Sequence, residues 1–321
     1  MVWNIVLLII GILLLIKGAD DFVEGSSTIA KKMRIPALVI GLTLVSIGTS
    51  LPELSVSLTA SIKGQNEMSF GNVVGSNIFN TFVVIGTAAI FTPMIIDKNM
   101  KKYDLPILMG IYGLLALFAF VITPGMIQTW EGAILFALTF IYTAFLMIRS
   151  KNEIKNDDTN LEELADIKVS SNLFLVLCGM AGIIGGGTLV VDNAQIIALE
   201  LGMSELLVGL TVVSIGTSLP ELVTSIVAAK KGENDIAVGN AIGSSLFNVV
   251  LILGLSSTVK PMGVDMSCIM DIAVMFASAL LVFFMAFGKA QVGRVKGILF
   301  IAIYVVYFVY IILRNYGIIQ F

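Results

Sequence analysis

The sequence predicts an all-α membrane protein with ten transmembrane helices, built as two inverted repeats of five helices each. Three observations predict this fold class. Hydrophobic residues make up 57% of the 321 residues and charged residues only 13%, and the mean hydropathy is +1.00. Long apolar stretches follow one another along the chain, and two segments have closely similar sequences. Such a composition is typical of a chain that crosses a lipid bilayer many times.

Ten stretches are apolar and long enough to cross a bilayer, which takes about 20 residues of helix. They cover residues 2–30, 35–61, 68–91, 104–123, 127–148, 170–199, 204–229, 236–258, 267–287 and 295–315. The only long hydrophilic run lies between the fifth and the sixth of them. We therefore expect a first five-helix repeat over residues 1–148, a linker over 149–169 and a second five-helix repeat over 170–321.

The positions of Lys and Arg predict how the helices are oriented. With ten helices, Lys63, Lys260 and Arg314 fall on one side of the membrane, and Lys17 lies inside the first span. The other side receives all the remaining basic residues: Lys31, Lys32, Arg34, Lys98, Lys101, Lys102, Arg149, Lys151, Lys155, Lys168, Lys230, Lys231, Lys289, Arg294 and Lys296. Loops rich in Lys and Arg stay in the cytoplasm. We therefore expect a plasma-membrane protein with both termini outside and a cytoplasmic linker.

The two similar segments are residues 41–80 and 209–248. Aligned at a constant offset of 168, they are identical at 24 of 40 positions without a gap. Such a repeat indicates that one unit has been duplicated. Five helices are an odd number, so the second unit enters the membrane from the opposite side to the first. Inverted repeats that meet near the middle of the bilayer are typical of secondary transporters.

Each repeat contains the phrase Gly-Thr-Ser-Leu-Pro-Glu, which ends at Glu53 in the first copy and at Glu221 in the second. Proline has no N–H, so Pro52 and Pro220 interrupt the helical hydrogen bonding of their spans. We therefore expect helices two and seven to be discontinuous. An acidic residue inside a membrane span usually has a function, whereas a single proline kink or a small residue at a helix contact does not require one.

The next span of each repeat adds hydroxyl and amide side chains at helical spacing. Ser76 and Asn80 share one helix face, and Ser244 and Asn248 share the equivalent face. Together with the two phrases they supply carboxylate, hydroxyl, amide and backbone oxygens. Such oxygen ligands suit hard cations such as Ca2+ and Na+, whereas zinc and copper favour Cys or His ligands. The chain has no His and two Cys without metal spacing.

The two phrases, the Gly-Asn-x-x-Gly-Ser segments and the plan of five plus five helices resemble the alpha-repeats of sodium/calcium exchangers, within the cation/Ca2+ antiporters. The resemblance is to the prokaryotic type without a large regulatory loop. It implies ion-binding segments at 39–80 and 207–248 and an exchange of Na+ for Ca2+ by alternating access, without a cofactor. The ion ligands that it implies are Ser46, Thr49, Ser50, Glu53, Ser76, Asn80, Ser214, Thr217, Ser218, Glu221, Ser244 and Asn248, with Ser46 and Ser214 contributing backbone oxygens.

The resemblance also bears on which ions are coupled. Potassium-dependent exchangers carry an acidic residue at the position of Asn248, so the resemblance implies transport that is independent of K+ and electrogenic. An H+/Ca2+ antiporter, a cation channel and a cation sensor that does not transport stay open as alternatives. We expect no enzyme, because no nucleophile and base accompany the carboxylates. We expect no nucleic-acid partner, and a monomer in the lipid bilayer is compatible with the sequence.

Overall fold

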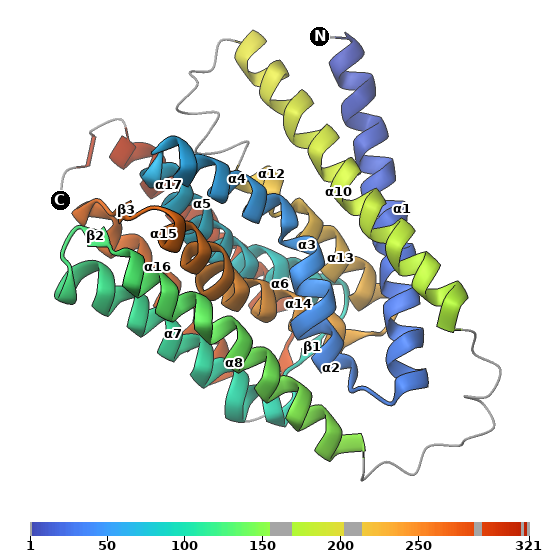
Figure 1. Cartoon of the computed structure of the whole chain (residues 1–321). Coiled ribbons are helices and arrows are strands. Elements are labelled where there is room, and N and C mark those ends of the chain that lie inside the picture. The colour runs from blue at the N-terminus through green and yellow to red at the C-terminus, as the bar shows by residue number, and fades with distance from the viewer. Residues whose placement is uncertain (1, 155–168, 202–213, 286–290, 316–317, 320–321) are drawn as a thin grey trace.

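The computed structural model describes residues 2–154, 169–201, 214–285, 291–315 and 318–319, and most of them are helical (Figure 1). Most of the predicted linker, residues 155–168, lies outside the described residues. Its two ends are helical, because the preceding helix continues to Ile154 and the following one begins at Val169. The described chain therefore contains no long irregular stretch between its membrane helices.

The first half begins with two long spans, the second of them interrupted. In chain order its elements are α1 (Val2–Met33), α2 (Ala37–Ile40), the π-helical turn η1 (Gly41–Val45), α3 (Ser46–Thr49), α4 (Leu51–Lys63), α5 (Asn66–Phe79), the π-helical turn η2 (Asn80–Val84), α6 (Ile85–Phe91), β1 (Met94–Ile95), the π-helical turn η3 (Met100–Asp104), α7 (Leu105–Leu117), the π-helical turn η4 (Phe118–Ile122), β2 (Met126–Ile127) and α8 (Thr129–Ile154).

The second half repeats much of this order. Its described elements are α10 (Val169–Glu200), α12 (Ser214–Thr217), α13 (Leu219–Lys230), α14 (Asn234–Phe247), the π-helical turn η6 (Asn248–Leu253), α15 (Gly254–Val259), β3 (Met262–Gly263), the 3-10 turn η7 (Met266–Cys268), α16 (Ile269–Met285), β4 (Gln291–Val292) and α17 (Arg294–Asn315).

The lengths of these helices fit a membrane protein. Within the described ranges, seven helices are long and apolar enough to cross a bilayer, and the pair Ala37–Thr49 and Leu51–Lys63, bent by 49°, would make an eighth. The helix Ile269–Met285 is apolar but shorter. The first part of the predicted seventh span falls on residues 204–213, which lie outside the described residues. An all-helical membrane protein is thus confirmed, and the count of ten stays a prediction.

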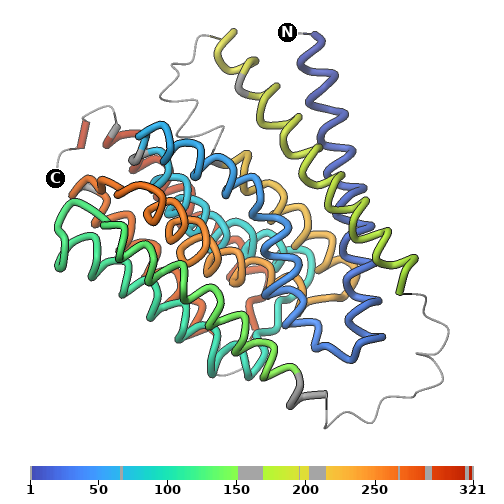
Figure 2. Tube along the Cα trace, in the orientation of Figure 1, coloured from blue at the N-terminus to red at the C-terminus, as the bar shows by residue number. Residues whose placement is uncertain are grey.

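Helices α1 and α10 pack against each other along one side of the other helices (Figures 1 and 2). Their backbones meet at glycines. A Cβ atom added to Gly18 would lie 2.7 Å from the backbone nitrogen of Ile183, and one added to Gly179 would lie 2.5 Å from that of Phe22. Real Cβ atoms do not approach so closely, so this interface depends on small residues, as close contacts between membrane helices do.

Two short antiparallel ribbons join the halves of the chain. Strand β1 pairs with β4, with Met94 opposite Val292, and β2 pairs with β3, with Met126 opposite Gly263. The repeat offset relates the two ribbons, because Met94 and Met262 lie 168 positions apart. The duplicated units therefore contact each other in equivalent ways at two places.

A buried ion pair ties η3 to α8 in the first half. The Arg149 guanidinium lies 3.0 Å from both carboxylate oxygens of Asp104, and the Tyr142 hydroxyl donates to the same carboxylate over 3.0 Å. Arg149 was expected to begin the hydrophilic linker, but only 9% of its side chain is exposed. The second half repeats the arrangement with Asp271, Tyr307 and Arg314.

Candidate ion-binding site

The two Gly-Thr-Ser-Leu-Pro-Glu phrases each break a helix at the serine. Helix α3 ends at Thr49 and α4 begins at Leu51, and between them Ser50 has φ −86° and ψ 8°. Ser218 has nearly the same values, φ −90° and ψ 3°, between α12 and α13. The following proline is the second residue of the new helix, where its missing N–H costs no hydrogen bond. The predicted breaks in the second and seventh spans therefore lie at these serines.

Each break places a glutamate in the first turn of the helix that follows, where the helix dipole favours negative charge. Glu53 and Glu221 are both fully buried. Ser218 donates a hydrogen bond to Oε1 of Glu53 over 3.2 Å, and Ser50 donates one to Oε1 of Glu221 over 2.8 Å. In both glutamates Oε2 has no hydrogen-bond partner in the described part of the protein. A buried polar atom without a partner is costly, so each Oε2 is available to a cation.

The threonines beside the breaks are held by asparagines of the other repeat. Thr49 donates to Oδ1 of Asn240 over 3.0 Å, and Thr217 donates to Oδ1 of Asn72 over 3.2 Å. These hydrogen bonds direct the threonine hydrogens toward the asparagines, so the hydroxyl oxygens can present a lone pair to a cation. The amide nitrogens of the two asparagines donate in turn to the equivalent serines, Ser57 and Ser225.

Asn72 and Asn240 belong to the Gly-Asn-x-x-Gly-Ser segments, but they were not among the predicted ion ligands. The signal that could have found them is their duplication, because they occupy equivalent positions 168 residues apart. Their hydrogen bonds run between the repeats: Asn72 on α5 holds Thr217 of the second break, and Asn240 on α14 holds Thr49 of the first.

The serines of the following helices lie beside the same breaks. The hydroxyls of Ser218 and Ser76 are 2.8 Å apart, and those of Thr49 and Ser244 are 3.4 Å apart. Ser244 also donates to the backbone oxygen of Ser46 over 3.4 Å. The predicted residue Ser214 begins α12, and its side chain lies outside the described residues.

Asn80 and Asn248 stand where α5 and α14 continue as π-helical turns. Such turns inside α-helices are frequent at functional sites. Both asparagines are fully buried. Among the described residues the Asn80 amide has no hydrogen-bond partner at either its oxygen or its nitrogen, and Oδ1 of Asn248 has none. These oxygens add to the two unpartnered carboxylate oxygens, so the group offers hard oxygen ligands only.

The described residues hold no group of three or more His, Cys, Asp or Glu side chains that could bind a metal. Charge at the candidate site therefore comes from the glutamate pair, and the other candidate ligands are neutral.

The chain matches the profile of the family described as sodium/calcium exchanger protein over residues 3–148 and 171–313. It belongs to the sodium/calcium exchanger family.

Individual relatives of this exchanger cover nearly the whole chain. The inner membrane protein YrbG of Escherichia coli is 38% identical, with 91% of this chain and 92% of that protein covered. The sodium/calcium exchanger MaX1 of Methanosarcina acetivorans is 34% identical, with 95% and 97% covered. The structure of the sodium-calcium exchanger NCX_Mj, soaked with 10 mM Na+ and zero Ca2+, aligns with a TM-score of 0.82 at 33% identity and covers 95% of this chain and 97% of that chain.

Family membership confirms three expectations from the sequence: the chain is a multi-pass membrane transporter, it is an antiporter of the cation/Ca2+ type, and it is not an enzyme. Na+ and Ca2+ are the ions of the family.

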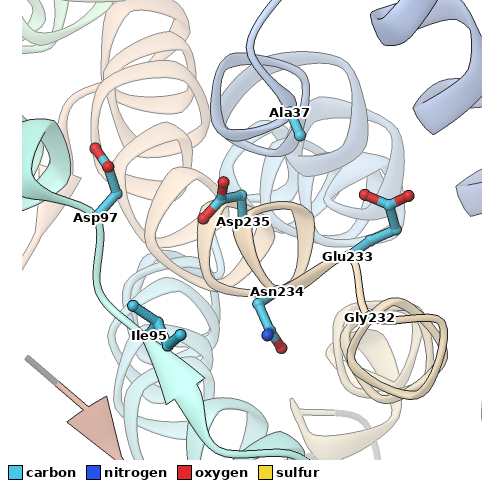
Figure 3. A pocket seen from close by; sticks show the side chains of 7 residues that line it. All are labelled: Ala37, Ile95, Asp97, Gly232, Glu233, Asn234 and Asp235. Atoms are coloured by element: carbon cyan, nitrogen blue, oxygen red, sulfur yellow. The ribbon is translucent and has the colours of Figure 1, made fainter.

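An acidic pocket of about 390 Å3 lies at one end of this exchanger, away from the glutamate pair. Figure 3 shows that it is lined by Ala37 at the start of α2, by Ile95 in β1 and Asp97 after it, and by residues 232–235, which form the turn before α14 and its first two residues. Its carboxylates belong to Asp97, Glu233 and Asp235. None of the predicted ion ligands lines this pocket, so it is distinct from the candidate ion-binding site.

Proposed function

We propose that the protein exchanges Na+ for Ca2+ across the membrane by alternating access, independently of K+ and with a net movement of charge. One observation carries this proposal. Two fully buried glutamates, one from each repeat, accept a hydrogen bond from the other repeat's serine and keep one oxygen without a partner among the described residues. A pair of buried negative charges with free oxygens needs a cation to be stable.

The proposed ligands are those that the sequence resemblance implies, drawn equally from the two repeats. The carboxylates of Glu53 and Glu221 supply the charge, and hydroxyl, amide and backbone oxygens complete the shell. The full set is Ser46, Thr49, Ser50, Glu53, Ser76, Asn80, Ser214, Thr217, Ser218, Glu221, Ser244 and Asn248. Ca2+ accepts about six to eight such oxygens. The hydrogen bonds from each break to the other repeat's glutamate support a single site to which both repeats contribute.

The charge of the site supports the proposed coupling. Two carboxylates balance one Ca2+ or two Na+, so any further Na+ would make the loaded site net positive. One surplus charge moved across the membrane gains about 2.3 kcal/mol per 100 mV. An inside-negative potential would then favour Ca2+ exit coupled to Na+ entry. Asn248 is neutral where potassium-dependent exchangers carry an acid, so no third carboxylate is present to balance K+.

We further propose a topology of ten helices in two inverted repeats, residues 1–148 and 170–321, with both termini outside and the segment 149–169 in the cytoplasm. The distribution of Lys and Arg supports this topology. The equivalent contacts of the two halves support it too, since the β1–β4 ribbon corresponds to the β3–β2 ribbon.

Helices α1 and α10 are the proposed moving pair, since their glycine contacts join them into one unit. Ion pairs hold α1 to the turn between α13 and α14 in the present conformation. The Lys231 ammonium lies 2.8 Å from Asp20 and 3.3 Å from Glu24, and Lys31 lies 3.2 Å from Glu233. Exposed pairs of this kind contribute about 0–1 kcal/mol each, so they can break as α1 slides. An empty site with two bare carboxylates resists the same movement, which favours exchange over leak.

The experiment that tests this function is transport in liposomes. Purified protein is reconstituted into vesicles loaded with Na+, and uptake of radiolabelled Ca2+ is followed after dilution into medium without Na+. We expect uptake that depends on the Na+ gradient, is unchanged when K+ replaces choline, and increases with an inside-positive potential. Glu53→Gln and Glu221→Gln should each abolish it, whereas Asp192→Asn, which changes an exposed acid on α10, should not.

Other outcomes would reassign the protein. Uptake driven by a pH gradient instead of a Na+ gradient would identify an H+/Ca2+ antiporter, and a requirement for K+ would identify potassium-coupled exchange. Ca2+ flux without any countertransport would identify a channel. Ca2+ binding without flux would leave a sensor.

A further inference from the structure

The candidate site departs from repeat symmetry at one buried residue. Asn77 and Ser245 occupy equivalent positions, 168 residues apart, yet they differ, although the residues directly before them, Ser76 and Ser244, are identical. Asn77 is fully buried. Its amide nitrogen donates to the backbone oxygen of Ser245 over 2.9 Å, and its amide oxygen accepts a hydrogen bond from Nδ2 of Asn248 over 3.0 Å.

These two hydrogen bonds fix the orientation of both amides. A backbone carbonyl can only accept, so the group of Asn77 that faces Ser245 must be its NH2. Its oxygen therefore faces Asn248, and the group of Asn248 that meets it must again be the NH2. The oxygen and nitrogen of a planar amide point in different directions, so Oδ1 of Asn248 is directed away from Asn77. That oxygen has no hydrogen-bond partner among the described residues.

The equivalent residue of the second repeat does not hold the other asparagine in this way. The Ser245 hydroxyl donates to the backbone oxygen of Ala241 in its own helix, over 2.8 Å. Within the described structure neither amide atom of Asn80 has a hydrogen-bond partner. The two asparagines of the candidate site are therefore unequal: a hydrogen bond from its amide fixes the orientation of Asn248, and among the described residues no hydrogen bond fixes that of Asn80.

We propose that Asn77 is a positioning residue that presents the oxygen of Asn248, and not its nitrogen, to the transported cation. This inference rests on the proposed function, because it takes Asn248 as an ion ligand. Without Asn77 the amide of Asn248 can rotate and turn its NH2 toward the cation. The hydrogens of that NH2 group carry partial positive charge and would repel the cation. The repeat symmetry of the site is thereby broken, and the side formed by the second repeat is organised for a cation before it binds.

Ca2+ binding to the purified full-length protein in detergent tests the proposal, measured by titration calorimetry in K+ buffer without Na+. We expect Asn77→Ala to weaken Ca2+ binding about tenfold, which is typical when a group that orients a metal ligand is removed. Ser245→Ala is the matched control, since its hydroxyl donates to Ala241 of its own helix and not to either asparagine of the candidate site, and it should stay within about twofold of wild type.

A double-mutant cycle separates positioning from general structural support. In an Asn248→Ala background, Asn77→Ala should have no further effect on Ca2+ binding, because the ligand that it orients is gone. An undiminished effect in that background would overturn the proposal. Thermal unfolding of each variant shows whether it is still folded. If Asn77→Ala does not fold, Asn77→Ser replaces it, because serine is the residue that the second repeat has at this position. Unfolding of both would assign Asn77 a structural role instead.

The same titrations distinguish this inference from the proposed function. Saturable Ca2+ binding that depends on Asn77, together with no Na+-driven uptake in liposomes, would refute exchange and leave the positioning role in place. Failure of the wild-type protein to bind Ca2+ would overturn both.

Discussion

Ser50 donates a hydrogen bond of 2.8 Å to the carboxylate of Glu221, although the two residues belong to different repeats. The reverse contact, from Ser218 to Glu53, measures 3.2 Å. Each helix break therefore supplies the donor for the glutamate that follows the other break. The two broken helices cannot separate without removing a hydrogen bond from each buried carboxylate, so the candidate site depends on both repeats.

The first prediction concerns these serines. Ser50→Ala removes a hydrogen bond to a charged group, worth about 1.5–3 kcal/mol, and a proposed ligand oxygen with it. We expect the Ca2+ concentration for half-maximal uptake to rise by about 10-fold to 100-fold, since each 1.4 kcal/mol is tenfold, and Ser218→Ala to act in the same direction. Ser55→Ala, on the exposed face of α4, is the control and should behave as wild type. An unchanged Ca2+ dependence in both serine variants would contradict the shared arrangement.

A second prediction follows from the asparagines that hold the threonines. Asn72→Ala removes the acceptor that directs the Thr217 hydrogen away from the proposed cation. We expect Ca2+ binding to weaken by about tenfold, as is typical when a residue that hydrogen-bonds and orients a metal ligand is removed. Ser57→Ala removes only the hydroxyl that accepts a hydrogen bond from the Asn72 amide, and it should weaken Ca2+ binding less. Calorimetric titration of the two variants gives their order, and a larger effect of Ser57→Ala would show that Asn72 does not act through Thr217.

The sequence predicted the breaks and the glutamates because their cause is local. A proline interrupts its own helix, and an acid in an apolar stretch is visible without knowledge of its neighbours. The role of Asn72 was not visible, because its partner Thr217 is 145 residues away. Asn77 gave no signal at all, because it is not duplicated in the second repeat.

Packing also decided two features that hydropathy could not predict. The π-helical turns that begin at Asn80 and Asn248 contain no glycine or proline to mark them. Arg149 looked like the start of a solvated linker, because an arginine lowers hydropathy whether or not it has a partner. In the structure it is buried against Asp104 from a preceding element, a contact that no local pattern shows.

The glycines between α1 and α10 lead to a third prediction. Gly179→Ala would place a methyl group 2.5 Å from the backbone nitrogen of Phe22, so the two helices must move apart. We expect loss of most Na+-driven Ca2+ uptake and a lower unfolding temperature. Gly185→Ala, on the same helix, is the matched control, because a methyl group there meets nothing within 4 Å, and Ala favours helix over Gly by about 1 kcal/mol. Equal behaviour of the two variants would show that the close contact does not matter for transport.

The buried ion pair of the first half gives the last prediction. Removing one member of a buried pair leaves the other charge uncompensated and costs about 3–5 kcal/mol, whereas apolar replacement of both is often neutral. We therefore expect Arg149→Met and Asp104→Asn each to lower the unfolding temperature of the detergent-solubilised protein strongly, and the double variant to recover most of the loss. The equivalent pair of the second half is more exposed, with 23% of the Arg314 side chain accessible, so Arg314→Met should cost less. A double variant no more stable than its singles would mean that the pair stabilises the protein through its geometry and hydrogen bonds and not through mutual neutralisation.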